Sequence, residues 1–125
     1  MSMEHSTTEG ARMNAAIKAR WIAALTNGEY RQIHGALHKA WPHLNMFCAL
    51  GVLCELHRLE THADYWRGPD GRGKFAYLEN FDYLPSAVAR WAGLPELPEM
   101  PISLIALDQQ GLSFAGIAAE IARYL

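Results

Sequence analysis

The apolar residues of this chain recur mainly at spacings of three and four positions, which is the period of an amphipathic helix. The first such set comprises Ile17, Trp21, Ala24 and Leu25. It predicts a helix over residues 14–26 that has Asn14 as its N-cap and ends at the Asn27-Gly28 pair.

A second apolar segment, residues 45–57, is hydrophobic on most sides and predicts a buried helix that packs on two or more surfaces. Asn45 is its predicted N-cap, and the helix continues to about Glu60 or Ala63. Gly51 lies inside this helix, where glycine costs about 1 kcal/mol relative to alanine. We therefore expect another backbone segment to approach closely at Gly51.

The C-terminal part of the chain predicts shorter helices separated by breaks. Ser86 begins a helix over residues 86–92 that ends at Gly93, and the three prolines that follow predict an extended connector. A short helix is expected over residues 103–110, and Ser113 caps a last helix that reaches the end of the chain. The buried face predicted for this last helix comprises Phe114, Ile117, Ala118, Ile121 and Leu125.

Alternating side chains over Tyr30–His38 predict a short strand, which Gly35 weakens. A helix that continues through Trp41 is an open alternative, because apolar residues at 33, 37 and 41 are four positions apart. The glycine-rich residues 66–74 predict a loop or a wide hairpin turn, and a short strand is expected to follow over Phe75–Leu78.

Together these elements predict an α+β fold: a compact, mainly helical single domain over residues 14–125 with a small antiparallel sheet. Residues 1–13 are polar and are expected to form a flexible leader. The chain has 125 residues and a mass of 14.0 kDa, and half of its residues are hydrophobic. This suits one domain with its own core and excludes disorder, collagen and a disulfide scaffold.

Two observations concern the compartment. The longest stretch without a charged residue, Ala40–Cys54, is too short to span a bilayer, and the polar start lacks the apolar region of a secretory signal. We therefore expect a cytoplasmic protein without membrane contact, in which Cys48 and Cys54 remain thiols.

Charge is unevenly distributed along the chain. Residues 10–78 hold nine basic and five acidic residues, a net charge of +4, whereas residues 79–120 hold one basic and six acidic residues, a net charge of −5. The positive half is too weakly charged for a typical nucleic-acid footprint. It suits a partner with an acidic surface, and we expect that partner to be a protein rather than a nucleic acid.

Residues 68–74 have the glycine and lysine spacing of a phosphate-binding P-loop. That motif needs a serine or threonine after its lysine to hold magnesium, and this chain has Phe75 there. It also needs a buried strand before it and a helix after it, neither of which the sequence predicts. A glycine-rich turn is the better interpretation.

No pattern identifies a metal site or a catalytic group. His34 with His38, and Cys54 with His57, could each share a helical face as zinc ligands, but close CxxC and HExxH spacings are missing. The serines at 86, 103 and 113 are read as helix caps rather than nucleophiles. We therefore expect a non-enzymatic protein with no metal and no cofactor.

Residues 104–121 resemble the opening of a DNA-binding helix-turn-helix, with a break at Gly111. A recognition helix usually carries basic or amide side chains, whereas Arg123 is the only basic residue from residue 104 to Leu125. A DNA-binding regulator is one alternative function, and a helical hairpin that closes the core is the preferred interpretation. A small-ligand binder, for example for a nucleotide signal, is the other alternative.

Basic and aromatic residues alternate over residues 58–75 and suggest an interaction surface, since Trp, Tyr and Arg concentrate binding energy at interfaces. Stacking on nucleic-acid bases and burial in the core are the competing interpretations. In the predicted surface, Arg31 and Gln32 supply hydrogen bonds, Trp66 is an anchor, and basic side chains steer an acidic partner. The predicted partner-binding residues are Arg31, Gln32, His34, Trp66, Arg67, Arg72 and Lys74.

Several stretches, in order along the chain, resemble a family of small uncharacterised proteins from tailed bacteriophages and prophages. They are KARWIAAL at 18–25, NGEYRQ at 27–32, FCALGVLCEL at 47–56, LP at 84–85 with Val88 and WAGL at 91–94, and SL at 103–104 with LD at 107–108, Gly111, SF at 113–114 and IA at 117–118.

This chain departs from the family pattern at Cys48-Ala49, where the family pairs two cysteines, and at Leu107-Asp108, where it carries Asn-Asp. The resemblance specifies no chemistry. It implies a phage-encoded accessory protein that binds and inhibits or modulates a host protein, such as a defence component, in the host cytoplasm.

Overall fold

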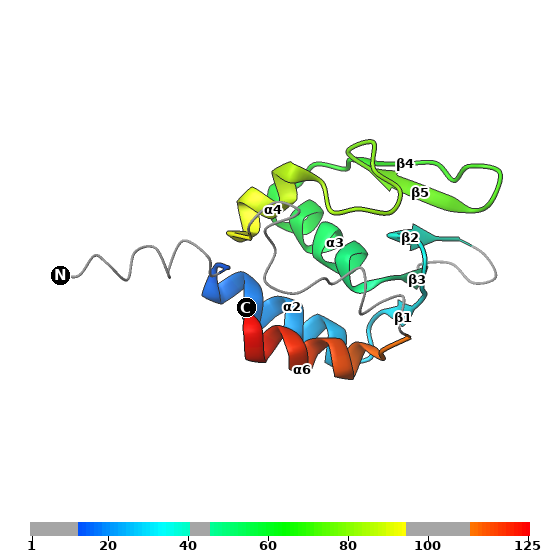
Figure 1. Ribbon diagram of the computed structural model, residues 1–125. Coiled ribbons are helices and arrows are strands. Elements are labelled where there is room, and N and C mark those ends of the chain that lie inside the picture. The colour runs from blue at the N-terminus through cyan, green and yellow to red at the C-terminus, as the bar shows by residue number, and fades with distance from the viewer. Residues whose placement is uncertain (1–12, 41–45, 95–110) are drawn as a thin grey trace.

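The computed structural model describes residues 13–40, 46–94 and 111–125. These ranges hold four helices and five short strands, and they confirm an α+β fold (Figure 1). In chain order the elements are α2 (Ala15–Thr26), β1 (Arg31–Gln32), β2 (His38–Lys39), β3 (Met46–Phe47), α3 (Ala49–Thr61), β4 (Trp66–Arg67), β5 (Lys74–Tyr77), α4 (Ser86–Ala92) and α6 (Phe114–Tyr124).

The strands form one mixed sheet in the order β1-β3-β2-β5-β4. Its neighbouring strands are antiparallel except β1 and β3, which are parallel, so the predicted antiparallel sheet is corrected at that pair. The single strand predicted over Tyr30–His38 is wrong, and so is the helical alternative as far as residue 40. Gly35, at a φ of +85°, lies between two separate strands, and β3 inserts between them in the sheet.

Helix α2 has the predicted N-cap and the predicted core face. The Asn14 side chain accepts a hydrogen bond from the Ile17 backbone N–H, and the four apolar residues at helical spacing are buried. Trp21 is fully buried, and its indole Nε1 donates to the Ala49 carbonyl at 2.9 Å. This bond satisfies the indole N–H in the core and fixes α2 against the first turn of α3.

The start of α3 differs from the prediction. The helix begins at Ala49 with Cys48 as N-cap, and Met46–Phe47 form β3 instead of a first helical turn. Both strand residues are buried and pair with strands on either side, and a short apolar run of this kind cannot be told from buried helix by periodicity. The predicted cap Asn45 lies outside the described residues, and the helix ends at Thr61 as expected.

The close approach predicted at Gly51 is confirmed. A Cβ atom at this position would lie 1.8 Å from the Leu37 carbonyl oxygen, far inside contact distance. The same carbonyl accepts a hydrogen bond from the N–H of Cys48, the residue between the end of β3 and the start of α3. Glycine therefore allows the segment between β1 and β2 to lie directly on the first turns of α3.

The last two helices agree with the prediction in extent. Helix α4 ends at Gly93 in the left-handed region, but Pro85 rather than Ser86 occupies the N-cap position. Ser113 caps α6 by accepting from the Gly116 N–H, and every residue of its predicted core face is buried. The predicted proline connector and the helix over 103–110 fall on residues 95–110, outside the described residues.

The helices form layers beneath and beside the sheet. Helices α2 and α6 lie side by side, α3 packs on α2, and α4 and the β4–β5 hairpin lie on the other side of α3 (Figure 1). Met13, which the prediction placed in the leader, is buried in this core; residues 1–12 are outside the described residues. Among the described helices, none has the length and apolarity needed to cross a membrane.

Replacing Gly51 by alanine tests the contact between the sheet and α3. The added methyl would meet the Leu37 backbone, which cannot move without shifting the sheet, so we expect Gly51→Ala to lower the free energy of unfolding by about 3 kcal/mol. Chemical denaturation measures the change. Gly71→Ala is the control, since a Cβ there meets nothing within 4 Å, and a change as small as in this control would contradict the assignment.

Candidate functional site

The register of the sheet places two predicted basic residues, Arg31 and Lys74, on one face together with Lys39. Arg31 lies opposite Met46, Met46 lies opposite Lys39, and Lys39 lies opposite Lys74. Residues directly opposite each other project from the same face of a sheet. This row therefore crosses four adjacent strands, from β1 at one edge to β5.

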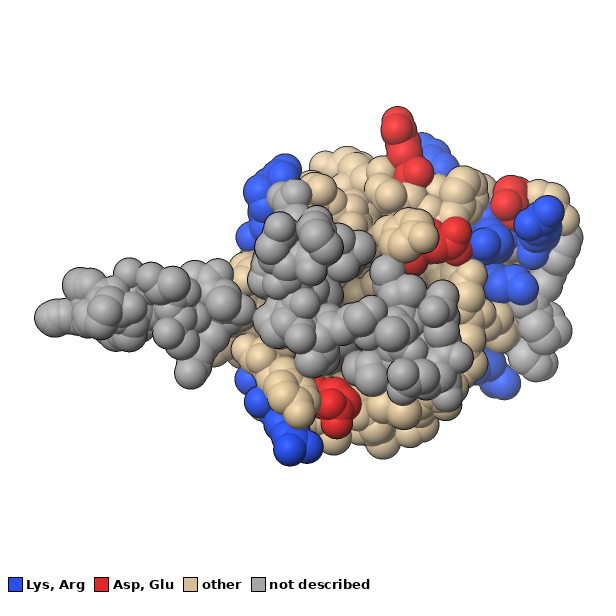
Figure 2. Space-filling model, in the orientation of Figure 1, with Lys and Arg blue, Asp and Glu red and all other residues tan. Residues whose placement is uncertain are grey.

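Arg67 joins the same face from the other edge of the sheet. It lies opposite Ala76, which is two residues from Lys74 and therefore shares its side. We call the set Arg31, Lys39, Arg67 and Lys74 the basic face. Basic side chains gather at the end of the molecule where β2, β4 and β5 lie (Figure 2).

Lys39 is the member of the basic face that sequence reasoning missed. It was not among the predicted residues because the predicted strand ended at His38. Neighbouring residues of a strand project from opposite faces, so Lys39 is expected on the face opposite His38. This inference requires that β2 is known to be a separate strand.

Two other predicted residues, Gln32 and Trp66, lie on the opposite face. That face carries a row of rings in which His38 stacks between Phe47 and Phe75, with centroid distances of 4.2 and 4.3 Å. The indole of Trp66 lies at the edge of this row, 4.8 Å from the His38 ring. We call this set of rings the aromatic face, and it belongs to the interior of the fold.

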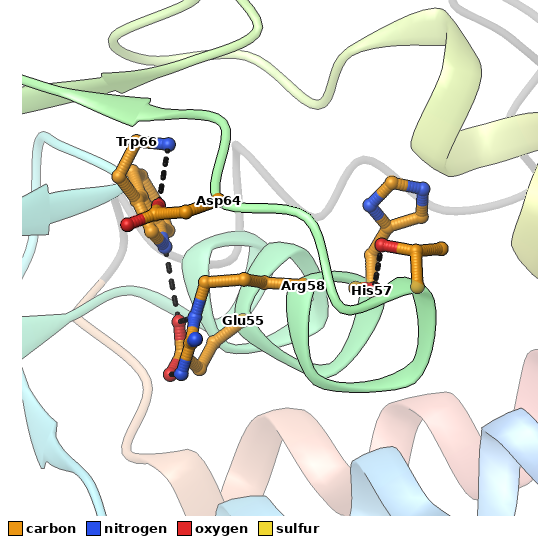
Figure 3. Close-up of polar contacts among 6 residues, drawn as sticks. Glu55, His57, Arg58, Asp64 and Trp66 are labelled. Atoms are coloured by element: carbon orange, nitrogen blue, oxygen red, sulfur yellow. Dashed lines mark hydrogen bonds and ion pairs between the residues drawn. The ribbon is translucent and has the colours of Figure 1, made fainter.

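Trp66 is half-buried and bonded internally. Its Nε1 donates to Glu55 Oε1 at 3.0 Å, and the same carboxylate accepts two bonds from Arg58, at 2.9 and 2.5 Å (Figure 3). The hydrogen bonds to Glu55 raise the pKa of Arg58 above its ordinary value. The Trp66 ring also packs against the Tyr77 ring, with 4.6 Å between the ring centroids. The side chain ties β4 to α3, and we leave it out of the candidate surface.

Gln32 is likewise used inside the protein. Its side-chain amide donates to the Leu112 carbonyl at 2.7 Å and accepts from the Phe114 N–H at 2.9 Å. The two bonds hold the start of α6 on the β1 edge of the sheet. The remaining predicted residues, His34 and Arg72, are exposed: His34 lies between β1 and β2, and Arg72 lies in the β4–β5 turn.

The glycine-rich segment 68–73 forms the turn of the β4–β5 hairpin, as expected, and not a P-loop. The Asp70 carboxylate accepts from the backbone N–H groups of Arg72 and Lys74, at 2.8 and 2.9 Å. These bonds lower the pKa of Asp70. The turn is therefore ordered by a side chain of its own and presents Arg72 beside the basic face.

The basic face is not uniformly positive. Lys74 Nζ lies 3.0 Å from Asp82 Oδ1, and the pair is partly exposed. Arg67 Nη1 donates to the carbonyls of Asp64 and Trp66, at 3.1 and 2.7 Å, which fixes the guanidinium at the sheet edge without neutralising it. The basic face thus includes one ion pair and one guanidinium held by the backbone of its own strand.

A second cluster of titratable groups lies beneath the hairpin, on the side of α3. His57 is 7% exposed, and its Nδ1 is 2.7 Å from the Tyr77 hydroxyl. Burial lowers the pKa of His57 from its ordinary value of 6.5, against an opposing effect of Glu60. Burial also raises the pKa of Tyr77. Both groups are therefore uncharged at neutral pH and act as a structural contact.

The candidate metal ligands are not brought together. His34 and His38 lie outside any helix, and Cys54 is fully buried on α3, where burial raises the pKa of its thiol. Within residues 13–40, 46–94 and 111–125, no group of three His, Cys, Asp or Glu side chains could hold a metal ion. No disulfide joins Cys48 and Cys54.

A protein-family model described as a domain of unknown function (DUF8296) matches residues 13–125. No curated protein and no solved structure matches the chain significantly.

The lowered pKa of His57 predicts the pH dependence of stability. Above about pH 7, His57 is neutral in both the folded and the unfolded chain, and its contribution is constant. As pH falls through 6.5, the unfolded chain takes up the proton more readily, so the free energy of unfolding decreases. Urea denaturation at pH 7.5 and 5.5 measures this decrease.

His57→Gln should reduce that pH-dependent decrease, because it removes the imidazole whose pKa is lowered in the folded chain. An equal decrease in the wild-type protein and His57→Gln would show that another group is responsible.

Proposed function

The chain belongs to the DUF8296 family, and we propose that it is a non-enzymatic binding protein whose basic face receives the acidic surface of a protein partner. The observation that carries this proposal is the basic face itself. Its four cationic side chains come from four different strands and project from one side of the sheet. Charges gathered in this way steer an oppositely charged partner and fix its orientation.

The pairing of Lys39 with Lys74 supports a binding role over a structural one. Like charges directly opposite each other in a sheet destabilise it. Asp82 compensates Lys74 in part, but it lies outside the sheet in the segment after β5. A sheet built only for stability gains nothing from this arrangement, whereas an acidic partner would relieve the repulsion.

The mixed charge of the surface favours a protein over a nucleic acid. The Asp70 and Asp82 carboxylates lie next to the basic residues Arg72 and Lys74, and carboxylates repel a phosphate backbone. A protein surface can present both signs of charge and match such a mixed surface. The net charge of residues 10–78 is only +4, which also favours a protein partner over a nucleic acid.

The resemblance of the sequence to small bacteriophage and prophage proteins supports a host protein as the partner. In this proposal the protein acts in the cytoplasm of the host cell and inhibits or modulates that partner, for example a component of host defence. The lack of a membrane-spanning helix among the described residues is consistent with such a place of action.

Affinity capture from nuclease-treated host lysate, read by mass spectrometry, tests the proposal. The double variant Arg31→Gln/Lys39→Gln removes two charges from the basic face and should lose most of the captured partner. The matched control Lys18→Gln/Arg123→Gln removes the same charge from the start of α2 and the last turn of α6, at the end of α6 that lies away from β1 (Figure 1). It should capture the partner like the wild-type protein.

Binding of the purified partner should also weaken as salt is raised, because the steering charges are screened. Equal loss in both double variants would contradict a defined surface. Capture from untreated lysate that is lost in the nuclease-treated lysate would point to nucleic acid instead.

A further inference from the structure

We propose that the partner's acidic segment also carries an aromatic or large apolar side chain, and that Phe81 and Tyr83 are its anchors on this protein. The inference rests on the proposed function and extends it to the chemistry of the bound segment. Phe81 is 37% exposed and Tyr83 is 54% exposed, although both are large hydrophobic residues. Partly exposed aromatic side chains of this kind dominate the energy of protein interfaces.

The segment that carries the two rings borders the basic face. Phe81 and Tyr83 flank Asp82 in the chain, and the Asp82 carboxylate contacts Lys74 at 3.0 Å. The Phe81 carbonyl accepts a hydrogen bond from the Leu37 N–H at 2.9 Å, which places this segment alongside the start of β2. A segment bound along the basic face would therefore meet Phe81 and Tyr83 next to Lys74.

The segment that presents the rings is held in place by a strained turn. Tyr77 and Asn80 exchange two backbone hydrogen bonds, at 2.8 and 3.0 Å, and Leu78 and Glu79 between them both have positive φ, +48° and +72°. Glycine or asparagine usually occupies such positions. Strain of this kind persists at binding sites, where it fixes a segment in its binding conformation before the ligand arrives.

The Lys74–Asp82 pair sets up competition between Asp82 and a carboxylate of the bound segment. In the unbound protein Asp82 supplies the carboxylate that Lys74 contacts. A carboxylate of the bound segment can take that place, so the charge of Lys74 is matched in both states. The partner's carboxylate then competes with Asp82, and removing the Asp82 charge should strengthen binding.

Two fluorescein-labelled decapeptides of equal charge test the inference: one alternates Glu with Tyr, and the other alternates Glu with Ser. Fluorescence anisotropy at low salt measures their dissociation constants. We expect the Glu–Tyr peptide to bind at least fivefold more tightly. Tyr83→Ser should remove this difference, whereas Tyr124→Ser, a control residue of similar exposure on α6, should keep it.

Asp82→Asn should tighten the binding of both peptides, a gain that a folding defect would not produce. Equal affinities for the two peptides in the wild-type protein, or an unchanged difference in Tyr83→Ser, would overturn this inference and leave the proposed function standing. No binding of either peptide would overturn both proposals. Tighter binding of a single-stranded oligothymidylate than of either peptide would also overturn both, in favour of nucleic acid.

Discussion

The fold depends on the contact between the Leu37 backbone and Gly51. Leu37 lies between β1 and β2, its carbonyl accepts from the Cys48 N–H at the start of α3, and its N–H donates to the Phe81 carbonyl. Its side chain is fully buried in the core. One residue thus joins the sheet, the central helix and the segment that follows β5, and only a residue without a side chain at position 51 leaves room for it.

The strands are too short for long backbone ladders, and side-chain packing across the sheet also holds them together. On the inner face, the stacked rings of Phe47, His38 and Phe75 cross three strands that contribute only two to four residues each. Stacking of this kind adds to the burial of apolar area and compensates for short ladders. The opposite face carries the charged side chains of the basic face around two buried residues, Met46 and Ala76.

The sequence predicts the helices well because each has a periodic apolar face and a local end signal, as Trp21 and Ile121 illustrate. It does not predict β3, because a buried two-residue strand has no period of its own. The candidate surface is only half predictable for a related reason. Arg31 and Arg67 are recognisable as surface residues, but the side on which Gln32 and Trp66 lie depends on a register that distant strands determine.

The bonds that Arg67 makes to its own strand have a consequence for the whole sheet. Strand β4 forms one edge, and an edge normally offers its carbonyl groups to any strand that comes near. Here the guanidinium covers the carbonyls of Asp64 and Trp66. A strand from a second copy of the chain would have to displace this side chain before it could pair, so the sheet is protected against extension from that side at high protein concentration.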